Sequence, residues 1–186
     1  MIVIGITGTN GAGKGTLVEY LVTHKRFVHY SVRGFLIEEI KKRGLPMDRD
    51  NMVALGNELR RDNSPSYITD CLFEQAKSAG KNAVIESIRT PGEIDSLRRN
   101  GEFYLLAVYS DPKTRYERVC KRGSETDNIS YEEFIAHEER EMSSTDPNKQ
   151  NLRRCIELAD YSIENNSSID DLHNSLEKIL LNILAK

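Results

Sequence analysis

Cysteine and histidine are sparse in this sequence, and their spacing matches no known kind of site. The three cysteines, Cys71, Cys120 and Cys155, lie far apart, and there is no C-x-x-C motif or zinc-type Cys/His spacing. An odd number of separated cysteines argues against a disulfide framework, so reduced thiols in a cytoplasmic protein are the simplest interpretation. The four histidines are scattered, and we assign them no catalytic role.

Long apolar runs and an excess of one charge are also missing. No run approaches the roughly 20 apolar residues of a membrane helix, and the apolar start MIVIGI lacks the basic leader of a signal peptide. The chain has 26 Lys and Arg against 29 Asp and Glu, and this formal net charge of −3 gives no reason to expect nucleic acid or an anionic membrane as partner. We therefore expect a single cytoplasmic domain of 186 residues, with neither nucleic acid nor a membrane as partner.

Strand and helix patterns alternate along the chain. Short β-rich runs, typical of strands in a buried parallel sheet, occur at 2–7, 27–32, 82–87, 102–110 and 160–165. Helical spacing and turn residues predict helices at 16–24, 34–43, 48–61, 65–79, 91–100, 111–123, 131–142, 151–159 and 168–184. This alternation predicts an α/β fold with a five-stranded parallel sheet flanked by helices.

The stretch GTNGAGKGTL lies between the first strand and the first helix. Its glycines accept positive φ, and the backbone amides of such a loop can turn toward an anion at the start of the following helix. Lys14 would then reach the terminal phosphates of a nucleotide. The hydroxyl comes one residue later than in the motif G-x-x-x-x-G-K-[ST], because Gly15 follows the lysine. We predict an ATP site formed by Gly8, Thr9, Asn10, Gly11, Ala12, Gly13, Lys14, Gly15 and Thr16.

The ending Lys14-Gly15-Thr16 resembles the loop of adenylate kinases and other nucleoside-monophosphate kinases. The resemblance extends along nearly the whole chain and comes closest to an archaeal adenylate-kinase-like group, which is itself similar to dephospho-coenzyme-A kinases. It implies a P-loop NTPase fold with a core at 1–122 and 151–186, an acceptor-binding helical region at about 33–80 and a helical lid at about 123–150. It also implies ATP and Mg²⁺ as cofactors, with the hydroxyl of Thr16 at the phosphates and the metal.

The segment NAVIESIR delivers a carboxylate at the end of a strand, where ligands bind in such sheets. It is similar to the DG-x-(P)-R segment of adenylate kinases, with Glu86 in place of the aspartate and Ser87 in place of the glycine. The resemblance implies that Glu86 orients magnesium, directly or through water. It also implies that Arg89 faces the same cleft, where it would bind the acceptor and the transferring phosphoryl group.

Further arginines resemble those that surround the transferring phosphoryl group. RYERVCKRG is similar to the start of the lid in these kinases, and there we favour Arg118 and Arg122, which share a helix face at a spacing of four. Arg140, in EEREM, resembles the arginine at the end of the lid. The alternative for each of the three is a solvated partner of neighbouring glutamates.

The acceptor side departs from the family pattern. YSVRGFLIEEIKKRGLP has Arg33-Gly34 where the archaeal group has Gly-Asp, and Arg33 is our candidate for the missing positive charge. Arg60, in NELRRD, matches an arginine of the archaeal RELR segment and is a second acceptor candidate. LADYSIENNSSIDDL resembles the ending of the archaeal group and of dephospho-coenzyme-A kinases, which implies that Asn165 lies near the ATP adenine.

These residues predict an ATP-dependent phosphotransferase that acts on a small nucleotide, with a nucleoside monophosphate as the favoured acceptor. Dephospho-coenzyme A is the close alternative, but that reaction benefits from a carboxylate base where this chain reads VRGF. A regulatory P-loop protein that binds nucleotide without phosphotransfer is a third reading, and the candidate arginines count against it.

Overall fold

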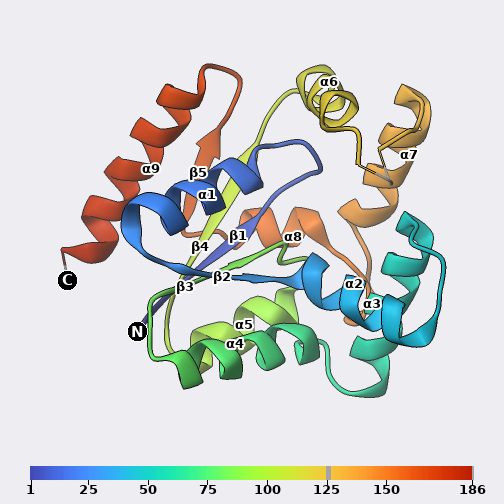
Figure 1. Ribbon diagram of the computed structural model, residues 1–186, viewed down its shortest axis with the longest axis horizontal. Helices are drawn as coiled ribbons and strands as arrows, with labels where there is room; N and C mark the ends of the chain where they lie inside the picture. The colour runs from blue at the N-terminus through green and yellow to red at the C-terminus, as the bar shows by residue number, and fades with distance from the viewer. Residues whose placement is uncertain (125–126, 186) are drawn as a thin grey trace.

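A five-stranded, all-parallel sheet forms the centre of the computed structural model, which describes residues 1–124 and 127–185 (Figure 1). The strand order is β2-β3-β1-β4-β5, and every neighbouring pair is parallel. The strands are β1 (Ile2–Thr7), β2 (Val28–Ser31), β3 (Ala83–Glu86), β4 (Glu102–Tyr109) and β5 (Tyr161–Glu164). The predicted α/β fold with a parallel sheet is therefore confirmed.

Helices follow or separate the strands as expected. They are α1 (Lys14–Lys25), α2 (Val32–Arg43), α3 (Arg49–Asp62), α4 (Tyr67–Ala79), α5 (Pro91–Asn100), α6 (Pro112–Arg122), α7 (Tyr131–Met142), α8 (Leu152–Glu157) and α9 (Ile169–Leu184). Helix α1 begins two residues earlier than predicted, because the phosphate loop leads directly into its first turn. Helix α8 is shorter than predicted and ends at Glu157.

Two apolar layers enclose the sheet, as the strand pattern requires. On one face, Ile4 and Ile6 of β1 belong to a core shared with α1 and α9. On the other face, Val3 of β1 belongs to a core shared with α3, α4 and α5. Successive side chains of a strand point to opposite faces, so an uninterrupted apolar strand can contribute to both cores. Figure 1 shows α1 and α9 on one side of the sheet and α4 and α5 on the other.

The remaining helices gather beyond the carboxyl ends of the strands. Helix α2 continues directly from β2, and α3 packs against it. Helix α6 follows β4, and α7 packs against both α6 and α8 (Figure 1). The described part of the predicted lid contains α7, whose start is fixed by a capping box between Ser130 and Glu133. Residues 125 and 126 of that predicted lid, and residue 186 of the predicted core, lie outside the described residues.

No helix among the described residues has the length and apolar character needed to cross a membrane.

Candidate active site

The phosphate loop is held in a shape that only glycine tolerates at several positions, and Gly8 and Gly13 show why. Gly8 has a φ of 139°, and a Cβ there would lie 2.1 Å from the carbonyl oxygen of Val108. Gly13, directly before α1, has a φ of 109°, and a Cβ there would lie 2.2 Å from Nδ2 of Asn165. Both the backbone conformation and the close neighbours therefore require glycine.

Lys14 folds back over its own loop. Its Nζ donates hydrogen bonds to the carbonyl oxygens of Gly8 and Thr9, each at 2.9 Å. The pKa of Lys14 is lowered from 10.5 to about 7, chiefly by burial and next by the nearby guanidinium of Arg89, against the opposing effect of Glu86. A phosphate group bound beside this lysine would favour its charged form and raise the pKa again.

Asn165 supports the loop from the turn that follows β5. It is 6% exposed, its Nδ2 donates to the carbonyl oxygen of Ala12 at 2.8 Å, and its backbone N–H donates to Tyr109. The resemblance implied a place near the ATP adenine. Here Asn165 lies against the phosphate loop and also lines the cavity above it.

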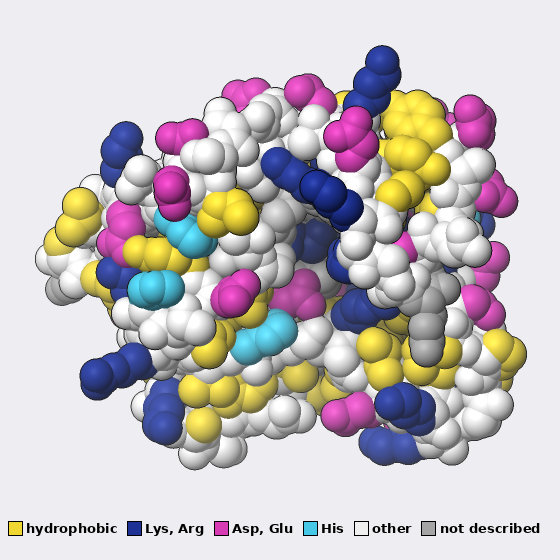
Figure 2. All heavy atoms as spheres, turned by 45° about the horizontal axis from the view of Figure 1, so that its top comes forward, with side chains coloured by type: hydrophobic (Ala, Val, Ile, Leu, Met, Phe, Trp, Pro, Cys, Tyr) yellow, Lys and Arg dark blue, Asp and Glu magenta, His cyan; other side chains and the backbone are white. Residues whose placement is uncertain are grey.

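A cavity of about 850 Å³ lies over the phosphate loop and extends between α2 and α3. This volume is typical of small-molecule sites. Figure 2 shows Lys and Arg side chains gathered around a hollow in this face of the molecule. The predicted site residues that line the cavity are Asn10, Gly11, Gly13, Lys14, Gly15, Thr16, Arg33, Arg60, Glu86, Arg89, Arg118, Arg122 and Asn165.

Glu86 is fixed at the carboxyl end of β3 by two hydroxyl groups. Ser31 Oγ donates to Glu86 Oε1 at 2.7 Å, and Ser87 Oγ donates to Glu86 Oε2. Ser87 has a φ of 69°, a left-handed conformation that favours glycine. Glycine, which the resemblance to adenylate kinases implies at this position, would adopt the same conformation without strain.

The oxygen atoms of Thr16 and Glu86 suit magnesium, which needs few protein ligands. They do not suit a metal ion whose ligands all come from the protein. The described residues contain no group of three or more His, Cys, Asp or Glu side chains that could hold a metal ion. Magnesium commonly takes one or two protein oxygens and completes its shell with phosphate oxygens and water. One carboxylate and one hydroxyl beside a phosphate loop match that arrangement.

Two arginines of α6 reach the cavity. Arg118 Nη1 donates to Ser110 Oγ at 3.3 Å. Arg122 donates to both carboxylate oxygens of Asp127 at 2.7 Å and to the side-chain oxygen of Asn10 at 3.3 Å. Burial raises the pKa of Asp127, but hydrogen bonds from Arg122 and Ser124 outweigh it and hold the pKa at about 2. Asp127 therefore stays ionised and keeps Arg122 beside the phosphate loop.

Arg33 and Arg60, the two residues predicted to bind the acceptor, both line the cavity, in different surroundings. Arg33 is the second residue of α2, and burial and the neighbouring Arg122 lower its pKa. Arg60 is 2% exposed, and its Nη2 and Nε donate to Glu93 Oε1 at 2.9 and 3.2 Å. The carboxylate of Glu93 is itself fully buried. Arg60 therefore carries a structural ion pair in addition to lining the cavity.

Helix α7 brings a glutamate rather than the expected arginine to the cavity. Arg140 is mostly exposed, donates to Asp50 of α3 at 3.1 Å, and is absent from the described residues that line the cavity. The next residue, Glu141, is 6% exposed and accepts hydrogen bonds from Arg49 and Arg89. The reason is the phase of the helix, because Glu141 shares one face with the buried Phe134 at a spacing of seven, whereas Arg140 is turned away.

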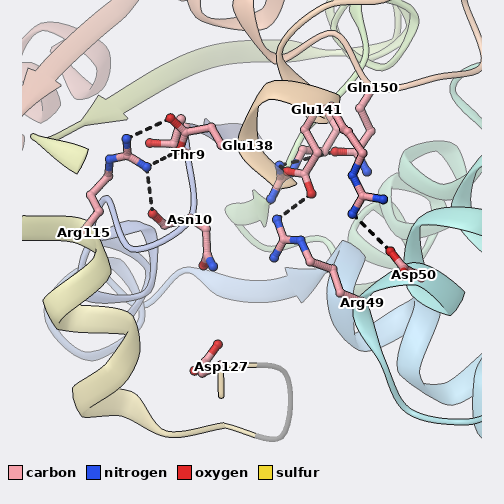
Figure 3. Close-up of polar contacts among 12 residues, drawn as sticks. Thr9, Asn10, Arg49, Asp50, Arg115, Asp127, Glu138, Glu141 and Gln150 are labelled. Carbon is pink, nitrogen blue, oxygen red and sulfur yellow. Dashed lines mark hydrogen bonds and ion pairs between the residues drawn. The ribbon is translucent and has the colours of Figure 1, made fainter. Parts of the chain in front are cut away.

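Sequence reasoning also missed the pair of Arg115 and Glu138, which links α7 to the phosphate loop. Arg115 of α6 is buried, donates to the backbone oxygens of Ser110 at 2.8 Å and Asn10 at 3.3 Å, and makes a paired contact with Glu138. Figure 3 shows this group beside a separate one in which Arg49 points toward Glu141. The spacing Phe134, Glu138, Glu141 is the sequence signal that could have indicated an inward-facing side of α7.

Comparisons with known proteins agree with this architecture. The model of a family described as an AAA domain matches residues 4–146. A UPF0200 protein of Methanocaldococcus jannaschii is 32% identical over 187 aligned residues, covering 99% of this chain and 91% of that protein. A gluconokinase structure from Sinorhizobium meliloti has a TM-score of 0.57 at 13% identity and covers 98% of this chain and 95% of its own. Shikimate kinase from Aquifex aeolicus has a TM-score of 0.51 at 14% identity, with coverages of 98% and 96%. The likeness to these structures confirms the P-loop kinase fold.

Proposed function

This chain belongs to the AAA domain family, and on that premise we propose that it is an ATP-dependent phosphotransferase that acts on a small nucleotide, with a nucleoside monophosphate as the favoured acceptor. One observation carries the proposal. A single cavity joins the phosphate loop to Glu86 and to arginines from four different parts of the chain. Positioning and charge neutralisation are what phosphoryl transfer chiefly needs from a protein.

The ATP side of the proposal rests on the loop and its neighbours. The loop amides and Lys14 would bind the ATP phosphates, and Glu86 with Thr16 would hold magnesium, which supplies positive charge to the phosphate oxygens. Arg118 and Arg122 would neutralise the negative charge on the transferring group. The acceptor oxygen forms its bond to the γ-phosphorus as the bond to the β–γ bridging oxygen breaks, and ADP leaves with that electron pair.

The acceptor side combines apolar walls with positive charge. Val32 and Leu36 of α2 and Met52 of α3 line the cavity beside Arg33 and Arg49. Apolar walls suit the flat base of a nucleotide, and guanidinium groups suit its phosphate. A phosphate acceptor is already ionised at neutral pH, so the reaction needs no strong base. These features support a nucleoside monophosphate over a hydroxyl acceptor.

A coupled ADP-release assay tests the proposal. Purified protein with Mg-ATP would be screened against AMP, CMP, UMP, GMP, dCMP, dTMP and dephospho-coenzyme A, with shikimate and gluconate as hydroxyl acceptors. We expect turnover with at least one nucleoside monophosphate. Lys14→Ala should abolish it, whereas the matched control Lys42→Ala changes an exposed lysine of α2 and should retain it.

Each other outcome has a defined meaning. Turnover with dephospho-coenzyme A alone would favour the coenzyme-A alternative, and turnover with shikimate or gluconate alone would replace the nucleotide acceptor by a hydroxyl compound. ATP binding without product from any acceptor would favour the regulatory reading. Full turnover by the Lys14→Ala variant would refute the kinase assignment altogether.

A further inference from the structure

We infer that Glu141 competes with the anionic group of the acceptor for Arg49 and Arg89. Binding of the acceptor must therefore displace the carboxylate of Glu141 from both arginines. The inference rests on the proposed function, because it concerns the acceptor part of the same cavity. It adds a regulatory feature: the enzyme admits only acceptors whose anion binds the two guanidinium groups better than a single carboxylate does.

The first observation is that Glu141 occupies a pair of arginines from separate elements. Arg49 is the first residue of α3, and Arg89 lies in the segment between β3 and α5. One oxygen of Glu141 accepts from Arg49 Nη2, and the other accepts from Arg89 Nη1. Both arginine side chains line the cavity, and their exposed fractions are 16% for Arg49 and 15% for Arg89. The carboxylate is the group that joins them.

The second observation is that Glu141 leaves part of this pair unsatisfied. The Nε of Arg49 is buried and has no hydrogen-bond partner among the described residues. On Arg89, Nη1 also makes a long contact of 3.4 Å with the side-chain oxygen of Gln150. Buried donors are normally satisfied, because each one left unpaired costs free energy. An anion with more oxygens than a carboxylate could satisfy donors that Glu141 does not reach.

The charges favour replacement of the Glu141 carboxylate by a phosphate group at the two arginines. Burial raises the pKa of Glu141, but the guanidinium groups of Arg89 and Arg49 outweigh this effect and hold the pKa below its usual range. Glu141 therefore carries one negative charge at neutral pH. A phosphate monoester carries about 1.5 to 2 negative charges at pH 7 and offers three oxygens. Two guanidinium groups can bind such a group in a bidentate manner.

The position of Glu141 in α7 allows local release. It lies one residue before the end of the helix. The other inward glutamate, Glu138, is held separately by the buried Arg115, and Phe134 packs beneath that arginine with its ring 5.5 Å from the guanidinium carbon. Figure 3 shows the two anchor points as separate groups. Release of the last turn of α7 would break the exposed contact of Arg140 with Asp50 as well as those of Glu141, while the first turns keep their contacts.

Calorimetric titration with inorganic phosphate tests the inference directly. Each protein would first be saturated with Mg²⁺ and a non-hydrolysable ATP analogue, so that the phosphate loop is filled and phosphate reports on the acceptor side. Glu141→Gln removes the competing charge and should lower the Kd for phosphate by about 10-fold or more. Glu139→Gln, the matched control, removes the same charge from an exposed position of α7 and should leave the Kd unchanged. Arg49→Ala should abolish the gain when it is combined with Glu141→Gln.

A thermal unfolding series keeps the inference testable if Glu141→Gln folds poorly. This variant leaves two arginines without their anion, so phosphate should raise its Tm more than that of the wild type. Glu141→Asp keeps the charge but shortens the side chain, and it should show an intermediate Kd for phosphate. An unchanged or higher Kd for phosphate in both variants would overturn the inference. Failure of the ATP analogue to bind would instead overturn the proposed function.

Discussion

Glu93→Gln should lower the free energy of unfolding by about 3–5 kcal/mol, although Glu93 does not line the cavity. The carboxylate is fully buried at the start of α5. Its Oε1 accepts from Arg60 at 2.9 and 3.2 Å, and its Oε2 accepts from the backbone N–H groups of Arg89 at 2.7 Å and Thr90 at 3.0 Å. One side chain therefore caps a helix, pairs a buried arginine and fixes the backbone of a candidate acceptor residue.

The magnitude follows from what the substitution leaves behind. Glutamine keeps one oxygen, so it can still cap α5 or accept from Arg60, but it provides no charge for the guanidinium. Removing one partner of a buried ion pair costs about 3–5 kcal/mol. Total stability is about 5–15 kcal/mol, so the loss is a large fraction of it. For a chain of this length we expect the Tm to fall by about 6–20 °C.

Urea unfolding followed by circular dichroism, with a double-mutant cycle, measures this effect. Arg60→Met removes the buried charge on the other side, so the double variant should cost less than the sum of the single variants, by about 2–3 kcal/mol. Glu58→Gln, on the same helix as Arg60, removes a partly exposed ion pair with Arg43 and should cost less than about 1 kcal/mol. A loss below about 1 kcal/mol for Glu93→Gln, or simple additivity in the cycle, would refute the reasoning.

Three further predictions concern the cavity. Gly13→Ala should weaken binding of the ATP analogue by about 10- to 100-fold in calorimetry, because its Cβ would meet Asn165, while Gly15→Ala should do far less because a Cβ there meets nothing within 4 Å. Binding of Mg-ATP at pH 8 should take up nearly one proton, because a pKa of about 7 leaves Lys14 mostly neutral until phosphate arrives; titrations in buffers of different ionisation enthalpy would reveal no uptake if this is wrong. Because the pKa of Asp127 falls from 3.8 to about 2 on folding, its ionised form stabilises the protein at pH values above about 3.8, and this stabilisation is lost as the pH falls toward 2. Asp127→Asn should therefore reduce the loss of stability with falling pH in this range, and an unchanged loss would contradict the prediction.

Local sequence patterns predicted the fold and the phosphate loop well. The loop is one contiguous segment between a strand and a helix, so its glycines and its lysine can be recognised from the sequence alone, although distant residues such as Asn165 also hold its shape. The strands were predictable for a similar reason, because residues buried on both faces form short apolar runs.

The rest of the site depends on contacts between distant segments. Arg60 and Glu93 are 33 positions apart, and no local pattern shows that a buried carboxylate holds that arginine. The helix α7 was predicted, but which of Arg140 and Glu141 reaches the cavity depends on the rotation of that helix, which packing against α6 and α8 determines. Such packing has no signature in one short segment of sequence.

The hydrogen bonds that Lys14 and Asn165 make to the phosphate loop have a consequence for nucleotide affinity. They engage the carbonyl groups of Gly8, Thr9 and Ala12, so side chains of the protein itself cross-link the loop. A loop that is already ordered loses little conformational entropy when it binds, and more of the interaction energy then appears as affinity. We therefore expect nucleotide association with this loop to be fast and to involve little rearrangement of its backbone.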